Sequence, residues 1–183
     1  MQIPLIISLI LSATTLPSIT PNTHQELFQQ SNSISFSKSK NTLKSIYLQS
    51  NKNHTFYCGC SFDTNKQIDH DSCNYSPRIK SNKRSHRLEF EHIVPAHALG
   101  KNLQCWKKPI CEKRNGKKYK GRKCCSKISD EYKQMQSDMH NLFPSVGEVN
   151  GDRSNFIFGE IYGEERKYGE CDFEVAKRIA EPK

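Results

Sequence analysis

The adjacent pair Glu91-His92 is the part of this sequence with the clearest capacity for chemistry. A carboxylate beside an imidazole offers a hard oxygen ligand for a divalent cation and a proton acceptor that titrates near neutral pH. Further acidic, amide and basic groups follow at residues 138–142 (Asp-Met-His-Asn-Leu) and 148–153 (Glu-Val-Asn-Gly-Asp-Arg). A strand-end glutamate beside a packed histidine would explain the pair alone. The whole set favours metal-assisted phosphodiester hydrolysis, which needs an activated water, charge neutralisation and a proton for the leaving oxygen.

The segment that carries the pair has the alternation of a β-strand. Residues 86–92 place Leu88, Phe90 and His92 on one face and Arg87, Glu89 and Glu91 on the other. In a regular strand Glu91 and His92 therefore point to opposite faces. Both can serve one site only if the chain bends, for which Pro95 offers a place, or if the site wraps the strand end.

Helices are expected on the C-terminal side of this strand. Ser129 precedes two acidic residues, and apolar side chains recur every three or four positions from Ile128 to Leu142, which predicts an amphipathic helix that Pro144 ends. Ser145 and Glu148 have the spacing of a capping box, so a second helix is predicted from there, with residue 150 in its second turn. A last helical face is predicted over residues 172–181.

Other segments are predicted from their composition. Residues 55–62 are short, aromatic and Cys-bearing, which favours a strand. Residues 105–125 carry nine Lys or Arg and one Glu without a periodic apolar face, which predicts a loop pinned by cysteines. Residues 3–13 are apolar and short, which is typical of a signal peptide and not of a membrane span.

Several long runs resemble the bacterial endonuclease I family of secreted, sequence-nonspecific nucleases. They are residues 56–60, 91–96, 104–106, 137–142 and 144–153, and the resemblance extends from about Phe56 to the last residue. It implies an α+β fold with the ββα-metal core of the His-Me finger superfamily, additional helices and disulfide-pinned loops. It also implies a sequence-nonspecific endonuclease that leaves 5′-phosphate ends.

The resemblance implies roles for individual residues. His92 would be the general base, and Glu91 and Asn150 would hold a single divalent ion, which oxygen ligands indicate is Mg²⁺ with Ca²⁺ or Mn²⁺ as substitutes. Arg122 would grip the cleaved phosphate, although it could also be one more solvated charge in the basic loop. Gln136 stands where the family has an acidic residue, whose loss would reduce activity if that acid orients the base.

Other polar residues near the motifs remain open. His97 does not have the spacing of a zinc metalloprotease pair with His92 and is not counted as a ligand. His140 and Asn141 could orient His92 or satisfy backbone groups at a helix end, and the second role is favoured. Asp152 and Arg153 could form an ion pair or touch a phosphate.

The charge of the chain favours an anionic partner. Twenty-eight Lys and Arg against nineteen Asp and Glu give a formal charge of +9, which fits DNA, with RNA as a second candidate, and also fits a membrane surface. Basic residues would contact phosphates without reading bases. The expected nucleic-acid-binding residues are Arg78, Lys80, Lys83, Arg84, Lys117, Lys118, Lys120 and Lys123.

The chain is expected to form one nuclease domain behind a leader. The predicted divisions are a signal peptide at 1–20 with an open cleavage point, a polar segment at 21–54, and an endonuclease I-like domain at 55–183 that lacks the C-terminal extension implied by the family. A periplasmic or secreted monomer is expected, with no stable protein partner and no transmembrane segment in the mature chain.

Eight cysteines, an even number, fit disulfides in an oxidising compartment, and their spacings are not those of a zinc site. The resemblance implies Cys58 with Cys171 and Cys60 with Cys73. The other four would close the basic loop in two bridges whose pairing the sequence leaves open: Cys105, Cys111, Cys124 and Cys125. Each bridge would contribute about 2–4 kcal/mol.

A second function class also fits the composition. A non-catalytic, cationic, disulfide-stabilised module that binds extracellular DNA or acidic polysaccharide would share the charge and the cysteines. Magnesium-dependent cutting of DNA distinguishes the two hypotheses.

Overall fold

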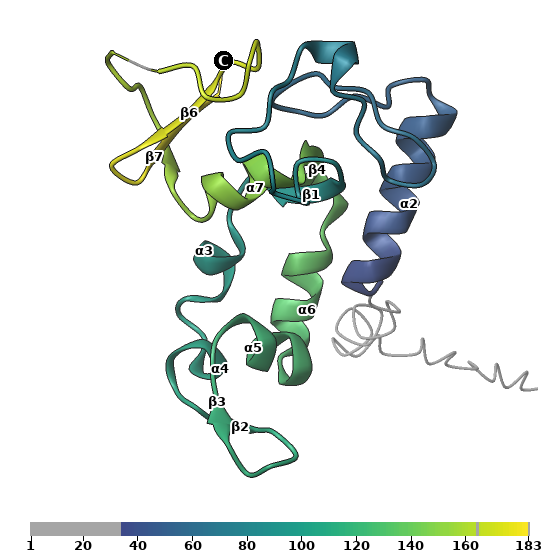
Figure 1. Cartoon of the computed structure of the whole chain (residues 1–183). Coiled ribbons are helices and arrows are strands. Elements are labelled where there is room, and N and C mark those ends of the chain that lie inside the picture. Colours follow the sequence, from purple (N-terminus) through teal and green to yellow (C-terminus); the bar gives the residue numbers. More distant parts are fainter. Residues whose placement is uncertain (1–33, 164, 183) are drawn as a thin grey trace, which may run out of the picture. The chain divides into compact units, whose positions relative to one another are not determined.

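The computed structural model describes residues 34–163 and 165–182, and Figure 1 shows their arrangement. The expected signal peptide lies outside the described residues. The described chain is a mixture of short helices and small sheets, as an α+β protein should be. Its elements are α2 (Phe36–Gln49), β1 (Leu88–His92), α3 (Ala96–Gly100), α4 (Gln104–Lys107), β2 (Cys111–Glu112), β3 (Lys118–Tyr119), α5 (Arg122–Ile128), α6 (Asp130–Ser137), β4 (Leu142–Val146), α7 (Gly147–Arg153), β5 (Ile157–Phe158), β6 (Phe173–Ala176) and β7 (Ile179–Pro182), with 3₁₀ turns at Asp71–Cys73 and Met139–Asn141.

A strand–strand–helix unit lies at the centre of the candidate site. The predicted strand is present as β1, which pairs antiparallel with β4 so that Leu88 faces Val146 and His92 faces Leu142. Helix α7 follows β4 directly and packs on both strands (Figure 1). The long insertion between the two strands, residues 93–141, contains α3 to α6. The helix is therefore held against the strand that carries Glu91 and His92.

Helix α2 is part of the same core. Ser35 caps it by accepting a hydrogen bond from the Lys38 backbone N–H, and the buried Leu43 packs in the main apolar cluster. The buried hydroxyl of Ser39 donates to the Ser137 carbonyl at the end of α6 (2.7 Å). Residues 36–49, which were expected to belong to a polar segment outside the domain, thus form a helix packed on it.

The strand predicted at residues 55–62 is not present. The chain turns tightly there, because Gly59 has a φ of 68° and two cysteines on either side of it enter disulfides. The β-pairing of the segment is limited to two isolated bridges, His54 to Ser61 and Phe62 to Ile68. The covalent links override the local strand preference.

The helix predicted from Ile128 to Leu142 is shorter than expected. Ser129 is its N-cap, as predicted, and accepts from the Tyr132 N–H. The helix ends at Ser137, and Leu142 and Pro144 lie in strand β4. Proline is tolerated in this strand because the sheet has only two strands, so each has an edge that needs no ladder hydrogen bond.

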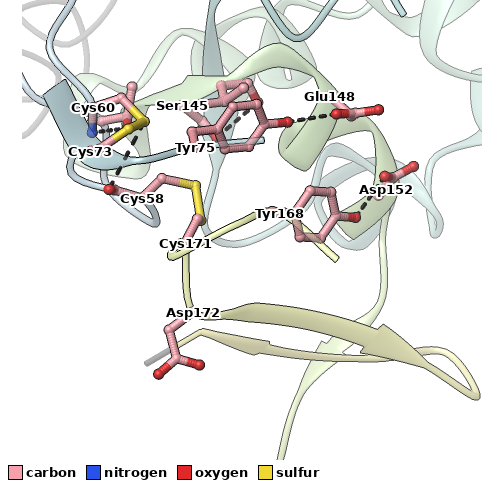
Figure 2. The surroundings of a disulfide bond; sticks show 12 residues. Cys58, Cys60, Cys73, Tyr75, Ser145, Glu148, Asp152, Tyr168, Cys171 and Asp172 are labelled. Atoms are coloured by element: carbon pink, nitrogen blue, oxygen red, sulfur yellow. Dashed lines mark hydrogen bonds between the residues drawn. A yellow bond between two sulfur atoms is a disulfide. The ribbon is translucent and has the colours of Figure 1, made fainter. Parts of the chain in front are cut away.

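The predicted capping box between Ser145 and Glu148 is also wrong. The helix predicted to follow it is nevertheless present and contains Asn150. Helix α7 starts at Gly147, and Ser145 is a buried strand residue. Glu148 instead accepts four hydrogen bonds from residues 75–82: from Tyr75 Oη (2.6 Å), the backbone N–H groups of Arg78 and Ile79 (both 3.1 Å) and Asn82 Nδ2 (3.0 Å). Figure 2 shows the Tyr75 hydroxyl pointing at this carboxylate. A buried carboxylate thus fastens a loop to α7.

Four disulfides join all eight cysteines. The two implied by the family resemblance, Cys58–Cys171 and Cys60–Cys73, are present, and Figure 2 shows their surroundings. The basic segment is closed by two bridges, as expected, and these are Cys105–Cys125 and Cys111–Cys124. The segment is not a plain loop, because it contains α4, the β2–β3 hairpin and the start of α5.

The helix predicted at residues 172–181 is wrong. The segment forms the antiparallel pair β6 and β7, and β5 joins β7 in parallel. Lys177 and Arg178 both have positive φ, which makes the two-residue turn of a hairpin. Phe173, Ala176 and Ile179 have the spacing of a helical face, but the turn and the Cys58–Cys171 bridge place the segment in a sheet.

Candidate active site

A cleft of about 480 Å³ brings together the residues expected to carry the chemistry. Glu91 and His92 reach it from β1, Arg122 from the start of α5, and Asn150 from α7. Because these residues come from separate elements, their meeting in one cleft is a property of the fold and not of sequence proximity.

The cleft wraps the end of β1. The strand stays regular through residue 92, and Glu91 turns toward α7 while His92 turns toward α2 and α6. Both still line the same cleft. The sequence left two ways for Glu91 and His92 to serve one site, a bend in the chain or a site that wraps the strand end. The structure has the site that wraps the strand end.

The His92 imidazole is held in one tautomer. It is 5% exposed, and its Nε2 lies 2.9 Å from the Gln136 carbonyl oxygen. Because a carbonyl oxygen can only accept, Nε2 carries the proton and Nδ1 remains as a proton acceptor. Burial lowers the pKa of His92 to about 4, and the cations of Arg122, Arg153 and Lys40 act in the same direction. The ring is therefore neutral near pH 7.

This arrangement does not use the side chain of Gln136, the position where the resemblance implies an acid. The contact to His92 comes from the backbone of residue 136, and the Gln136 side chain accepts from Ser126 Oγ at 3.0 Å. The orientation of the ring thus does not depend on an acidic side chain at this position.

Glu91 is a buried carboxylate with two partners on one oxygen. Its Oε1 lies 2.8 Å from Arg153 Nη1 and accepts from Tyr57 Oη at 3.1 Å. Burial raises its pKa to about 7, although Arg153 and Tyr57 lower it. The desolvated carboxylate would gain from a further cation.

Arg153 contacts the C-terminal end of β1 and holds it in place. Its side chain is among the most buried in the described chain, and it donates to the carbonyl oxygens of His92 (2.8 Å) and Ile93 (2.7 Å) as well as pairing with Glu91. The sequence left open whether Arg153 pairs with Asp152, and it does not. Sequence reasoning missed this role and that of Tyr57, because neither backbone contacts nor long-range partners have a spacing signal.

Glu89 connects Asn150 to the arginines of the cleft. Its carboxylate accepts from Asn150 Nδ2 (2.8 Å), from Arg84 Nη2 (2.6 Å) and from Arg87 Nη2 (2.6 Å). These contacts lower its pKa against the opposing effect of burial. With its amide nitrogen engaged, Asn150 retains Oδ1 as a free oxygen donor. The Arg84 guanidinium lies over Gly151, where a Cβ would collide with it.

Arg122 contacts an aromatic ring that also contacts the histidine. Its guanidinium carbon is 5.4 Å from the centroid of the Phe36 ring, and that ring is 5.2 Å from the His92 imidazole. The sequence aligned Arg122 only loosely, and the structure brings it to the cleft.

The oxygen donors of the cleft suit a hard cation. Both contacts to Glu91 fall on Oε1, which leaves Oε2, and Asn150 supplies Oδ1. Within residues 34–163 and 165–182 no group of three or more His, Cys, Asp or Glu side chains is arranged to hold a metal. A small set of oxygen donors fits Mg²⁺, which keeps several waters and shares substrate phosphates, better than it fits Zn²⁺.

A family model matches the sequence over nearly the whole chain. The model described as Endonuclease I matches residues 18–183. The chain belongs to the endonuclease I family. Among its relatives, an extracellular deoxyribonuclease of Aeromonas hydrophila is 46% identical over 124 residues, which are 66% of this chain and 49% of that protein.

Two further relatives of this endonuclease I chain have similar coverage. A periplasmic deoxyribonuclease of Aeromonas hydrophila is 44% identical over 135 residues (70% of this chain, 52% of that protein). Endonuclease-1 of Buchnera aphidicola subsp. Acyrthosiphon pisum (strain APS) is 39% identical over 143 residues (75% of this chain, 52% of that protein). The chain spans about half the length of the relatives it matches.

The basic residues expected to bind nucleic acid differ in their surroundings in this endonuclease I chain. Arg84 lines the cleft, but Arg78 does not, because it forms a two-pronged pair with Asp152 (2.9 and 3.1 Å). Tyr168 also donates to Asp152 (Figure 2). Arg78 is thus engaged by Asp152, as Arg84 is by Glu89, and the role of both as phosphate ligands stays a prediction.

The remaining basic candidates are exposed. Lys118 pairs with Glu112 across the β2–β3 hairpin, and Lys120 donates to the Lys107 carbonyl. The candidates with exposed side chains are Lys80, Lys83, Lys117, Lys118, Lys120 and Lys123. They lie outside the cleft lining and stay predictions.

His140 and Asn141, which were considered as possible partners of His92, have contacts elsewhere. Asn141 brackets Val94 by hydrogen bonds to both its backbone groups, and His140 pairs with Asp138. Asn141 thus has a structural contact, although to the backbone of Val94 and not to the helix end that was expected. His97 lines the cleft and contacts the Trp106 ring.

Among the described residues, no helix is both long enough and apolar enough to span a membrane.

Proposed function

We propose that this chain is a secreted endonuclease that hydrolyses phosphodiester bonds of DNA without sequence preference. The observation that carries the proposal is the single cleft that gathers Glu91, His92, Arg122 and Asn150. The relatives named deoxyribonucleases favour DNA, and RNA remains a second candidate substrate.

His92 is the general base in this proposal. Nδ1 is the only ring atom available as an acceptor, because Nε2 donates to the Gln136 carbonyl. The ring is neutral at physiological pH and can take a proton from water that attacks the phosphorus. The backbone contact keeps the imidazole from rotating away from the cleft.

Glu91 and Asn150 would hold one Mg²⁺ through Oε2 and Oδ1. When bound, the ion neutralises charge on the phosphate and acidifies water near the leaving 3′ oxygen. Glu89 keeps the Asn150 amide turned, and Arg153 keeps the Glu91 carboxylate in place. Ca²⁺ or Mn²⁺ could substitute.

Arg122 binds the phosphate that is cleaved. It lines the cleft beside His92, and its planar fork can contact two phosphate oxygens at once. Such a contact becomes stronger as negative charge builds up in the transition state. Cleavage would leave 5′-phosphate ends.

The unit of β1, β4 and α7 would be the ββα-metal core of the His-Me finger superfamily. Two antiparallel strands followed by a packed helix support this assignment, with the base on the first strand and Asn150 on the helix. We also propose a periplasmic or extracellular location, which four disulfides and the names of the relatives support.

The test is nicking of supercoiled plasmid by the disulfide-bonded protein with Mg²⁺, beside the same reaction in EDTA. We expect nicking only with Mg²⁺ and ends that accept a kinase label only after phosphatase treatment. A folded protein that binds the plasmid in low salt but never nicks it with Mg²⁺, Mn²⁺ or Ca²⁺ would refute the nuclease and favour the non-catalytic binding module.

A further inference from the structure

A second cleft of about 310 Å³ adjoins the candidate active site. Phe36 and Lys40 of α2 form one side of it, and Lys66 and Arg87 add two further cations. The two clefts share residues on β1, α5 and α7, which are Glu89, Phe90, Arg122 and Asn150. A ligand in the second cleft would therefore lie next to one in the first.

The two clefts differ in their balance of charge. The first is lined by Arg84, Arg122 and Arg153 against Glu89 and Glu91. The second is lined by Lys40, Lys66, Arg87 and Arg122 against Glu89 alone. The excess positive charge of the second cleft makes it a site for an anion and not for a metal ion.

The single carboxylate of the second cleft pairs with Arg87 and forms no ion pair with Lys40 or Lys66. Glu89 is already engaged by two arginines and Asn150. Among the described residues, no carboxylate oxygen lies within ion-pair distance of Lys40 or Lys66. Burial and the charges of Lys66 and Arg122 lower the pKa of Lys40, as expected where cations gather.

Aromatic and polar contacts hold the cations in place. The Lys40 Nζ lies 4.4 Å from the centroid of the Phe36 ring, which also contacts Arg122. Lys66 Nζ lies 3.4 Å from Asn41 Oδ1, on the same helix as Lys40. Helix α2 therefore positions positive charge beside the cleft.

We propose that this second cleft is a phosphate subsite, in which Lys40 and Lys66 bind the phosphate of the nucleotide next to the cleaved bond. The inference rests on the proposed function. With the scissile phosphate at Arg122, the neighbouring phosphate of the same strand enters the cationic cleft. Contacts to phosphate alone carry no base preference, which agrees with sequence-nonspecific cutting.

The first test measures binding without cutting. Binding of a fluorescein-labelled duplex is followed by anisotropy in EDTA over a range of salt concentrations, for the wild type, Lys40→Ala and Lys66→Ala. Lys38→Ala is the matched control, because Lys38 is exposed on α2 and lines neither cleft. Each lost phosphate contact should reduce the slope of log affinity against log salt by about 0.9. Slopes equal to that of Lys38→Ala would overturn the proposal.

The second test asks which phosphate is bound. Two oligonucleotides with neutral methylphosphonate linkages are compared. The first contains a single phosphodiester, and the second contains two adjacent phosphodiesters. The length of the product shows which linkage is cut. The wild type should cut the oligonucleotide with two phosphodiesters at a lower KM than the one with a single phosphodiester. Lys40→Ala should lose this difference in KM and should cut the single-phosphodiester substrate as the wild type does. An equal effect of Lys40→Ala on both substrates would overturn the subsite.

The two tests separate this inference from the proposed function. If the wild type does not nick plasmid with Mg²⁺, the nuclease fails, and the salt slope in EDTA still reports whether the second cleft binds phosphate. The melting temperature of Lys40→Ala should equal that of the wild type, because alanine favours the helix.

Discussion

Glu91 and His92 are neighbours in sequence, and burial shifts the pKa of each toward its neutral form. The pKa of Glu91 rises to about 7 and that of His92 falls to about 4. Between these values the imidazole is neutral, with its one proton on Nε2, while the carboxyl group is still protonated. Near neutral pH, the titration of Glu91 and not of His92 should therefore govern how the site responds to pH.

Binding of Mg²⁺ should become tighter as the pH rises through 7. Only the ionised form of Glu91 attracts the ion, and its population rises about tenfold between pH 6 and 8 for a pKa of about 7. We expect the Mg²⁺ concentration for half-maximal nicking to fall by roughly that factor over this range. Nicking rates over a Mg²⁺ series at both pH values measure it. The same half-saturation at both would contradict the prediction.

Glu89 is expected to act as a positioning residue. In Glu89→Gln the charge that holds Asn150 and two arginines is lost. Loss of a partner that orients a metal ligand typically reduces metal affinity or activity about 10- to 100-fold. The Mg²⁺ requirement for nicking measures it, with Glu112→Gln as the control, because Glu112 is an exposed glutamate paired with Lys118. An equal, small effect in both variants would exclude the role.

The residues of the candidate site could be predicted from the sequence only in part. Glu91, His92 and Asn150 belong to motifs, Arg122 was placed only by a loose alignment, and all four line one cleft. Arg153 and Phe36 could not be assigned, because they act through backbone carbonyls and ring contacts that leave no pattern. Lys40 lies in a segment whose polar composition indicated no part in the site.

Among the elements, helix α7 begins in close contact with the backbone that leads into β1. A Cβ at Gly147 would lie 2.6 Å from the Arg84 carbonyl oxygen and 3.1 Å from that of Arg87. The Gly147 N–H donates to the same Arg87 carbonyl at 3.0 Å. A glycine at this position lets the helix begin directly against the strand that carries the site.

Gly147→Ala should destabilise the protein by about 1–3 kcal/mol, because backbone atoms must move to admit the methyl group. Urea unfolding measures the change. Gly159→Ala is the control, because its Cβ would meet only a methyl group of the Ile179 side chain at 3.2 Å. If the two variants unfolded at the same urea concentration, the close approach at Gly147 would not limit stability.

Elements with local sequence signals could be predicted, and elements fixed by distant contacts could not. Strand β1 and the Ser129 cap were predicted, because alternation and capping are local signals. The C-terminal helix was wrong, because three apolar residues fit both a helical face and a hairpin until the turn at Lys177 and Arg178 is known. The strand at residues 55–62 was wrong because disulfides decide its path.

At the scale of the whole molecule, the disulfides should differ in their contribution to stability. Cys58–Cys171 closes a span of 113 residues and Cys60–Cys73 a span of 13. Loop-closure entropy gives about 5 kcal/mol for the first and about 3 kcal/mol for the second. Double Cys→Ala variants, unfolded with urea at low temperature, measure this difference. An equal or reversed order would contradict the entropic account.

The central claim is that His92 removes a proton from the attacking water, and single-turnover cleavage with saturating Mg²⁺ tests it most directly. His92→Ala is compared with His140→Ala, whose histidine is exposed and outside both clefts. We expect His92→Ala to cleave about 10²- to 10⁴-fold more slowly while it binds DNA normally in EDTA, and His140→Ala to match the wild type. A folded His92→Ala protein that cuts at the wild-type rate would contradict the account.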